Sequence, residues 1–204
     1  MSTAQPVHPR RLHLLVVGVG GQGVLTAARF LAEAGRLAGL EVVVSQLHGM
    51  SQWGGSVRST VLFGGYSSAF IEDGAADIVL GLEPLEVLRA RPKMSARTKV
   101  VTNLGVVVPQ LLAQRGQSYP DLDRTLAEIR AVVSQLVAID VLAVAMAAGA
   151  RRSLNVVMLG VLASLDYLPF DGDTLWRAVE ACGPAQHLEA NRRAFGLGKE
   201  AVTT

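Results

Sequence analysis

The sequence predicts an α/β fold: a Rossmann-like three-layer domain with a mostly parallel sheet and a helical C-terminal half. Two observations predict it. In the N-terminal half, short apolar runs of strand length alternate with helix-compatible segments and glycine-bearing turns, and from Asp123 onward helical periods dominate. Alternation of strands with helices is typical of parallel sheets that helices cover on both faces.

The first three elements form a recognisable unit. Leu12–Val19 is a continuous apolar run, which indicates a strand buried on both faces. After the glycine-rich segment Gly18–Gly23, residues Val24–Ala38 carry apolar side chains at helical spacing, and Gly39 marks the end of that helix. Glu41–Gln46 reads as a second strand. Together they predict a βαβ unit with parallel pairing and a right-handed crossover.

The remaining elements follow from the same signals. Further strands are expected at Ser56–Phe63, Asp77–Leu82 and Lys99–Asn103. Helices are expected at residues 123–134, 140–150, 154–167, 173–182 and 184–196. With no repeat and no linker composition, residues 1–204 read as a single domain, preceded by a flexible lead over residues 1–10.

Composition excludes several classes of function. Lys and Arg (19) nearly balance Asp and Glu (17), and basic residues do not alternate with aromatic ones, so nucleic-acid binding is not expected. Leu136–Ala150 is apolar but short for a membrane span and contains Asp140. The apolar run after Arg11 breaks into glycines and lacks a cleavage motif, so a cytoplasmic protein is expected. The one cysteine, Cys182, reads as a packing residue near a helix end.

The segment Gly18–Gly23 satisfies G-x-G-x-x-G between a strand and a helix. Glycines there allow a tight turn and let the backbone approach a phosphate, and the helix start presents unpaired N–H groups. The candidate ligand-binding residues of this turn are Gly18, Gly20, Gly21, Gln22 and Gly23. The alternative is that the glycines serve only close packing.

An ordinary NAD site is not expected, because the second predicted strand lacks the usual acidic residue at its end. It closes on Ser45 and Gln46, and its only acid, Glu41, stands at the beginning. In dinucleotide sites that acid holds the ribose hydroxyls. The turn therefore predicts a phosphate-bearing ligand other than NAD.

A second loop follows this strand and is expected at the carboxyl edge of the sheet, where open α/β folds bind ligands. Its candidate binding residues are His48, Gly49, Met50, Ser51, Gln52, Trp53, Gly54 and Gly55. Polar and aromatic side chains between glycines suit a contact surface. The alternative is a structural loop with Trp53 packed inward. No catalytic residue and no metal ligand is assigned; His48 is given a binding role only.

These two segments carry a family resemblance. GVGGQGVLTAARFLAEA (residues 18–34) and SQLHGMSQWGGSVRSTVLFG (residues 45–64) closely resemble the gamma-type subunit of 2-oxoacid:ferredoxin oxidoreductases, in particular the beta subunit of the indolepyruvate enzyme. Shorter matches include residues 140–143, 155–160 and 191–195, so the resemblance spans roughly Leu12 to Gly198. One departure is Trp53, where family members often carry a basic residue.

The resemblance implies a subunit of an enzyme that converts a 2-oxoacid, here an arylpyruvate such as indolepyruvate, and coenzyme A to acyl-CoA and CO2. Thiamine diphosphate, Mg and [4Fe-4S] clusters are then expected on a large alpha subunit, in a hetero-oligomer such as α2β2, with ferredoxin as acceptor. This chain lacks the Gly-Asp-Gly segment of thiamine enzymes, and one cysteine cannot ligate a cluster. Its implied task is to help bind CoA and to close the active site.

Two other classes of function stay open at this point. One is a stand-alone nucleotide-binding protein without a redox role, and the other is an NAD(P)-dependent dehydrogenase. A copurifying large subunit with ferredoxin-like cysteine spacings would favour the oxidoreductase, whereas nicotinamide binding by the isolated chain would favour the dehydrogenase.

Overall fold

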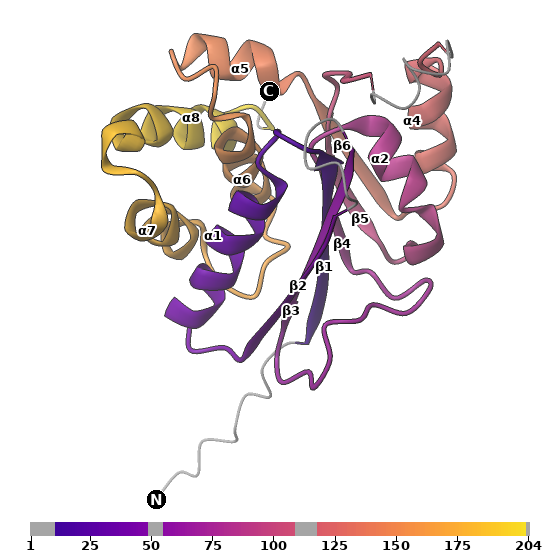
Figure 1. The fold of residues 1–204 in the computed structure, drawn as a ribbon, viewed down its shortest axis with the longest axis horizontal. Coiled ribbons are helices and arrows are strands. Elements are labelled where there is room, and N and C mark those ends of the chain that lie inside the picture. Colours follow the sequence, from indigo (N-terminus) through magenta and orange to yellow (C-terminus); the bar gives the residue numbers. More distant parts are fainter. Residues whose placement is uncertain (1–10, 49–54, 109–117, 203–204) are drawn as a thin grey trace, which may run out of the picture.

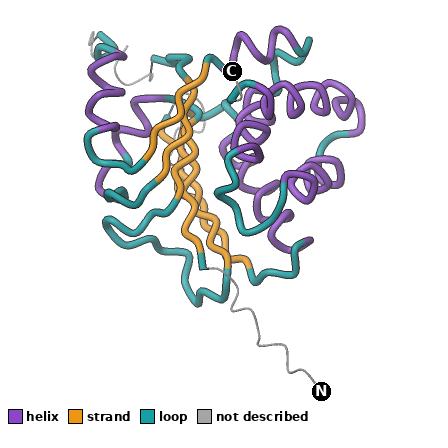
Figure 2. The backbone as a smooth tube through the Cα atoms, turned by 180° about the vertical axis from the view of Figure 1, so that it is seen from behind, coloured by secondary structure: helices purple, strands orange, loops and turns teal. Residues whose placement is uncertain are grey.

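The computed structural model describes residues 11–48, 55–108 and 118–202. They form a six-stranded sheet with helices on both faces, which Figure 1 shows from the side and Figure 2 from behind. The strands are β1 (Leu12–Val19), β2 (Val42–His48), β3 (Ser56–Phe63), β4 (Ile78–Gly81), β5 (Lys99–Asn103) and β6 (Gln135–Ile139). The helices are α1 (Val24–Leu37), α2 (Pro84–Arg89), α4 (Leu122–Arg130), α5 (Val141–Ala147), α6 (Leu154–Ser164), α7 (Gly172–Cys182) and α8 (Leu188–Glu200), with 3-10 turns η1 (Arg91–Lys93) and η2 (Ala185–His187).

The sheet order is β2-β3-β1-β4-β5-β6. β1, β4, β5 and β6 pair in parallel, whereas β3 lies antiparallel between β1 and β2. The predicted α/β class and mostly parallel sheet are therefore confirmed. The predicted direct pairing of the first two strands is wrong: they run in the same direction, but β3 returns between them and pairs with both.

The three layers follow from the alternation of side chains along the central strand. Leu14 and Val16 of β1 point into the larger apolar cluster, which joins α1, α5, α6, α7 and α8 to the sheet. Leu15 and Val17 point into a smaller cluster under α2 and α4. Because successive strand residues face opposite sides, a strand that is apolar throughout requires cover on both faces.

The C-terminal half contains one strand that the helical interpretation missed. β6 follows α4 and pairs with β5, with Val101 opposite Val137. The helix expected at residues 123–134 ends at Arg130, and the one expected at 154–167 ends at Ser164. The last helix begins only at Leu188, after the turn η2, and runs to Glu200 instead of ending at Gly196.

Chain direction places the glycine-rich turn at a particular edge of the sheet. α1 leaves the carboxyl end of β1 toward one face, and α2 leaves the carboxyl end of the neighbouring β4 toward the other, as Figure 1 shows. A crevice outside two such strands is the usual ligand site of an open α/β sheet. Among the helices of the described residues, none is long and apolar enough to cross a membrane.

Candidate functional site

The glycine-rich turn has the backbone geometry that glycine permits. Gly21 and Gly23 have φ angles of 99° and 85°, in the left-handed region, and Gly23 is the residue that precedes α1. Among the described residues, no acceptor bonds to the N–H of Gly21 or Gly23. Since α1 begins here, the turn offers these N–H groups together with the positive end of a helix dipole, a combination that favours anions in general.

Two of the glycines also serve close packing, the alternative raised from the sequence. A Cβ at Gly18 would lie 2.9 Å from Val24 Cγ2, so the strand and the helix it feeds leave no room for a side chain. A Cβ at Gly23 would lie 2.7 Å from Asn155 Nδ2, and that amide reaches the Gly23 carbonyl at 3.4 Å. The first turn of α6 thus packs directly on the start of α1.

Gln22 is held by the protein at both polar ends of its side chain. Its Oε1 accepts a hydrogen bond from the Val19 N–H at 2.7 Å, and its Nε2 donates to the Leu82 carbonyl at 3.0 Å. Gln22 therefore fixes the turn to the end of β4, a role that the sequence did not indicate. Asn103, at the end of β5, donates to the same carbonyl at 3.2 Å.

The two predicted loops meet through one backbone hydrogen bond. The N–H of Gly20 donates to the Gly55 carbonyl at 2.8 Å. His48 ends β2 with its backbone opposite Val57. The other predicted binding residues of this loop, residues 49–54, lie outside the described part of the chain.

A groove of about 380 Å³ opens beside the turn, on the α6 and α8 side. Its lining includes Gly21, Gly23 and Thr26 from the turn and α1, together with Arg151 and Arg152 from the α5–α6 connection. Further lining residues come from the starts of α6 and α8, among them Ser153, Asn155, His187 and Asn191. No acidic side chain is found among the described lining residues, so the groove is electropositive.

Arg151 and Arg152 are neighbours in the connection between α5 and α6, directly before Ser153. Both are exposed, and neither forms an ion pair with a described acid. The turn that carries them lies more than a hundred residues from the glycines in sequence, so only the packing of α6 against α1 brings them to one groove. Two adjacent arginines in the sequence do not by themselves indicate that they lie in a groove beside the glycine-rich turn.

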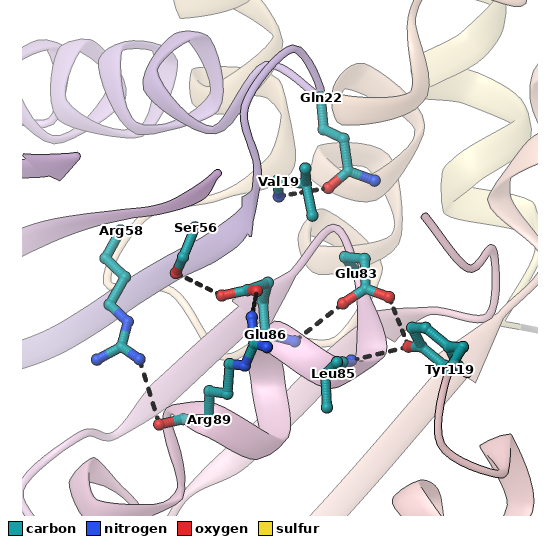
Figure 3. Close-up of polar contacts among 9 residues, drawn as sticks. All are labelled: Val19, Gln22, Ser56, Arg58, Glu83, Leu85, Glu86, Arg89 and Tyr119. Atoms are coloured by element: carbon teal, nitrogen blue, oxygen red, sulfur yellow. Dashed lines mark hydrogen bonds and ion pairs between the residues drawn. The ribbon is translucent and has the colours of Figure 1, made fainter. Parts of the chain in front are cut away.

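Two buried acids lie on the other side of the turn, at the start of α2 (Figure 3). Glu83 is the N-cap of α2: its carboxylate accepts the Glu86 N–H at 2.9 Å and the Tyr119 hydroxyl at 2.5 Å. Glu86 accepts the Ser56 hydroxyl and forms an ion pair with Arg89. Sequence reasoning did not single out either acid, because an N-cap acid before a proline reads as an ordinary helix start.

Burial sets the electrostatics of this cluster. Glu83 is 0% exposed, and loss of solvent raises the pKa of its carboxyl above the ordinary value, against the hydrogen bond from Tyr119 that lowers it. Burial also raises the pKa of the Tyr119 hydroxyl, and the neighbouring Glu83 carboxylate adds to that rise. In the described residues, no group of His, Cys, Asp and Glu is arranged to hold a metal ion.

An open, mostly parallel sheet with a glycine-rich turn between its first strand and the following helix defines a Rossmann-like domain. The family model described as pyruvate ferredoxin/flavodoxin oxidoreductase matches residues 13–201. The chain belongs to this family. The recognition made from the sequence is confirmed.

Curated relatives give the type of subunit. The chain is 36% identical to indolepyruvate oxidoreductase subunit IorB of Methanothermobacter thermautotrophicus over 91% of this chain and 95% of the relative. It is 34% identical to the IorB subunit of Archaeoglobus fulgidus over 92% of this chain and 94% of the relative. The chain is thus an IorB-like member of the family.

Solved structures agree on the fold. The gamma subunit of a keto/oxoacid ferredoxin oxidoreductase from Geobacter sulfurreducens superposes with a TM-score of 0.68 at 21% identity, covering 95% of this chain and 99% of that one. A 2-oxoglutarate:ferredoxin oxidoreductase from Magnetococcus marinus, solved with 2-oxoglutarate, coenzyme A and succinyl-CoA, gives 0.69 at 22% identity. The match covers 95% of this chain but 31% of that larger chain.

Proposed function

We propose that this chain is the non-cluster subunit of a cytoplasmic, thiamine-diphosphate-dependent 2-oxoacid:ferredoxin oxidoreductase that forms acyl-CoA and CO2. An arylpyruvate such as indolepyruvate is the proposed substrate, since the curated relatives named above are indolepyruvate oxidoreductase subunits. The chain's own part is to help bind CoA and to close the active site.

The observation that supports CoA binding is the electropositive groove. CoA carries a pyrophosphate and a ribose phosphate, and its thiol accepts the acyl group in the overall reaction. The N–H groups of Gly21 and Gly23, to which no acceptor of the described residues bonds, suit the pyrophosphate, and Arg151 and Arg152 of the same groove suit a further phosphate. No acid in the described lining opposes a ligand with this charge.

The second loop is proposed to contact the part of the ligand that lies beyond the phosphates. The hydrogen bond from Gly20 to Gly55 sets the end of this loop beside the glycine-rich turn. We assign the segment His48–Gly55 to the pantetheine arm or to the cofactor of the partner. Trp53, which replaces a basic residue of related chains, offers a ring for stacking.

The redox chemistry belongs to a partner in this proposal. With a single cysteine the chain has too few thiolates for an iron–sulfur cluster. We therefore assign thiamine diphosphate, Mg and the [4Fe-4S] clusters to a large alpha subunit, in an assembly such as α2β2 that reduces ferredoxin.

The test is calorimetric titration of the assembled complex with CoA, using a matched pair of glycine variants. Gly21→Asp introduces a negative charge at the groove, and Gly39→Asp introduces the same residue at the opposite end of α1. Both glycines have positive φ (99° and 75°), so each variant places a non-glycine residue at positive φ, and a Cβ at Gly39 meets nothing within 4 Å.

We expect Gly21→Asp to weaken CoA binding by about tenfold or more, through charge repulsion and loss of the amide contacts, and Gly39→Asp to leave it unchanged. Equal CoA affinity in the two variants, both assembled, would refute a CoA site at this turn. Nucleotide or NAD(P) binding by the chain without a partner would instead support a stand-alone nucleotide-binding protein or a dehydrogenase.

A further inference from the structure

Two separate sets of hydrogen bonds connect the glycine-rich turn to the start of α2. The first connection runs through Gln22, whose Nε2 donates to the Leu82 carbonyl while its Oε1 accepts the Val19 N–H. Leu82 directly precedes Glu83, the N-cap of α2. The C-terminal side of the turn is thereby tied to the segment from which α2 begins.

The second connection runs through β3. Gly20 donates its N–H to the Gly55 carbonyl at 2.8 Å, and the next residue, Ser56, donates its hydroxyl to Glu86 Oε2 at 2.5 Å. Figure 3 shows the Ser56 side chain directed at the Glu86 carboxylate. Glu86 thus holds Ser56, Ser56 fixes the position of Gly55, and Gly55 fixes the amide of Gly20.

Glu86 is suited to hold a fixed position. Its side chain is 0% exposed, and its second oxygen forms an ion pair with Arg89 one turn later on α2. A buried carboxylate that loses a partner has no solvent to replace it, so its hydrogen bonds are costly to break. The Ser56 contact is therefore more rigid than a surface hydrogen bond of the same length.

We propose that Glu86 is a positioning residue for the phosphate-facing turn, acting through Ser56 and Gly55 on the backbone of Gly20 and Gly21. The inference rests on the proposed CoA-binding function and adds the residues that set the geometry of that site. Backbone amides bind a phosphate well only when their N–H groups point at its oxygens within hydrogen-bond distance. A shift of Gly55 alters that direction at the turn without removing any group from the groove.

Ser56→Ala tests this proposal because it cuts the connection and keeps the Glu86–Arg89 ion pair. Ser59→Ala is the matched control: Ser59 lies on the same strand and is buried, and its hydroxyl donates to the Ser45 carbonyl at 2.9 Å, away from the turn. Ser56→Thr is the conservative variant, which keeps a hydroxyl at this position. The readouts, taken on the assembled complex, are the Kd for CoA by calorimetry and the separate values of KM for CoA and kcat.

We expect Ser56→Ala to raise both Kd and KM for CoA about three- to tenfold, the effect of one lost hydrogen bond, with a smaller change in kcat. Ser59→Ala should leave both values unchanged even if it lowers the unfolding temperature. Ser56→Thr should keep most of the wild-type affinity for CoA. The Ser56→Ala/Glu86→Gln double variant should bind CoA no more weakly than the weaker single variant, because both residues act through one connection.

Unchanged CoA affinity in Ser56→Ala, or an equal loss in Ser56→Ala and Ser59→Ala, would overturn the proposal. So would additive losses in the double variant. The Gly21→Asp variant separates the two levels of inference. If Gly21→Asp weakens CoA binding and Ser56→Ala does not, the positioning role fails alone; if neither variant affects CoA, the proposed CoA site fails as well.

Discussion

Two glycines of α8 that are two residues apart should respond to alanine in opposite directions. Gly198 lies where α8 crosses α6, and a Cβ there would stand 2.3 Å from the Val157 carbonyl oxygen. Gly160 of α6 is its counterpart, with a Cβ that would meet the Phe195 carbonyl at 2.2 Å. At Gly196 a Cβ meets nothing within 4 Å. The pair separates close packing from helix propensity.

The expected magnitudes follow from these distances. Gly196→Ala removes conformational freedom from the unfolded chain and should stabilise the protein by about 0.5–1 kcal/mol. Gly198→Ala has the same gain, but the obstructing atom is backbone, so the two helices must move apart. Overpacking of this kind costs about 1–3 kcal/mol or more. We expect a net loss of about 2 kcal/mol and an unfolding temperature lower by about 4–8 °C.

Calorimetric unfolding of the chain, free and in its complex, measures both effects. The expected order of unfolding temperatures is Gly196→Ala above wild type and wild type above Gly198→Ala. If Gly198→Ala unfolds at or above the wild-type temperature, the close crossing of α6 and α8 is refuted. A loss of equal size at Gly196 would show that alanine is disfavoured in α8 for a reason other than the crossing.

Two further predictions concern charge. Replacing Arg151 and Arg152 together by Ala should weaken CoA binding about tenfold at low salt, and the loss should be smaller at high salt. Arg130→Ala, on the opposite face of the sheet, should leave CoA binding unchanged. Equal losses of CoA affinity at the two places would contradict an electropositive groove. Burial raises the pKa of Glu83 above its ordinary 4.5, so the folded state holds this proton more tightly than the unfolded state. The wild-type protein should therefore gain stability relative to Glu83→Gln as the pH falls from 8 toward 4.5. Denaturant unfolding at several pH values measures the difference in unfolding free energy between the two proteins. A difference that does not change with pH would show that Glu83 does not take up a proton in this way.

Much of the site was predictable because its signals are local. The turn after Leu12–Val19 needs glycines for its backbone angles, and the helix start that follows is encoded in the next dozen residues. The position at the carboxyl edge follows from strand direction alone. These features depend on neighbours within about 20 residues along the chain, so they can be predicted from the sequence.

The parts that escaped prediction depend on distant neighbours. A short apolar run such as Gln135–Ile139 is compatible with strand or helix, and only its pairing with β5 decides. Nothing in Ser56–Phe63 says that this strand enters between β1 and β2. The sequence makes Gln22 a candidate ligand-binding residue, and it carries no signal for the hydrogen bond of its amide to Leu82, sixty residues away.

The sequence by itself determined the class of fold, the glycine-rich turn between a strand and a helix, and the family. Only the tertiary structure decided which side chains accompany that turn: Arg151 and Arg152 line the same groove, and Glu86 is connected to it through Ser56. The physical reason is that backbone conformation is set by local sterics and hydrogen bonding, whereas charge placed around a site depends on helix packing. That packing is fixed by contacts spread over the whole chain.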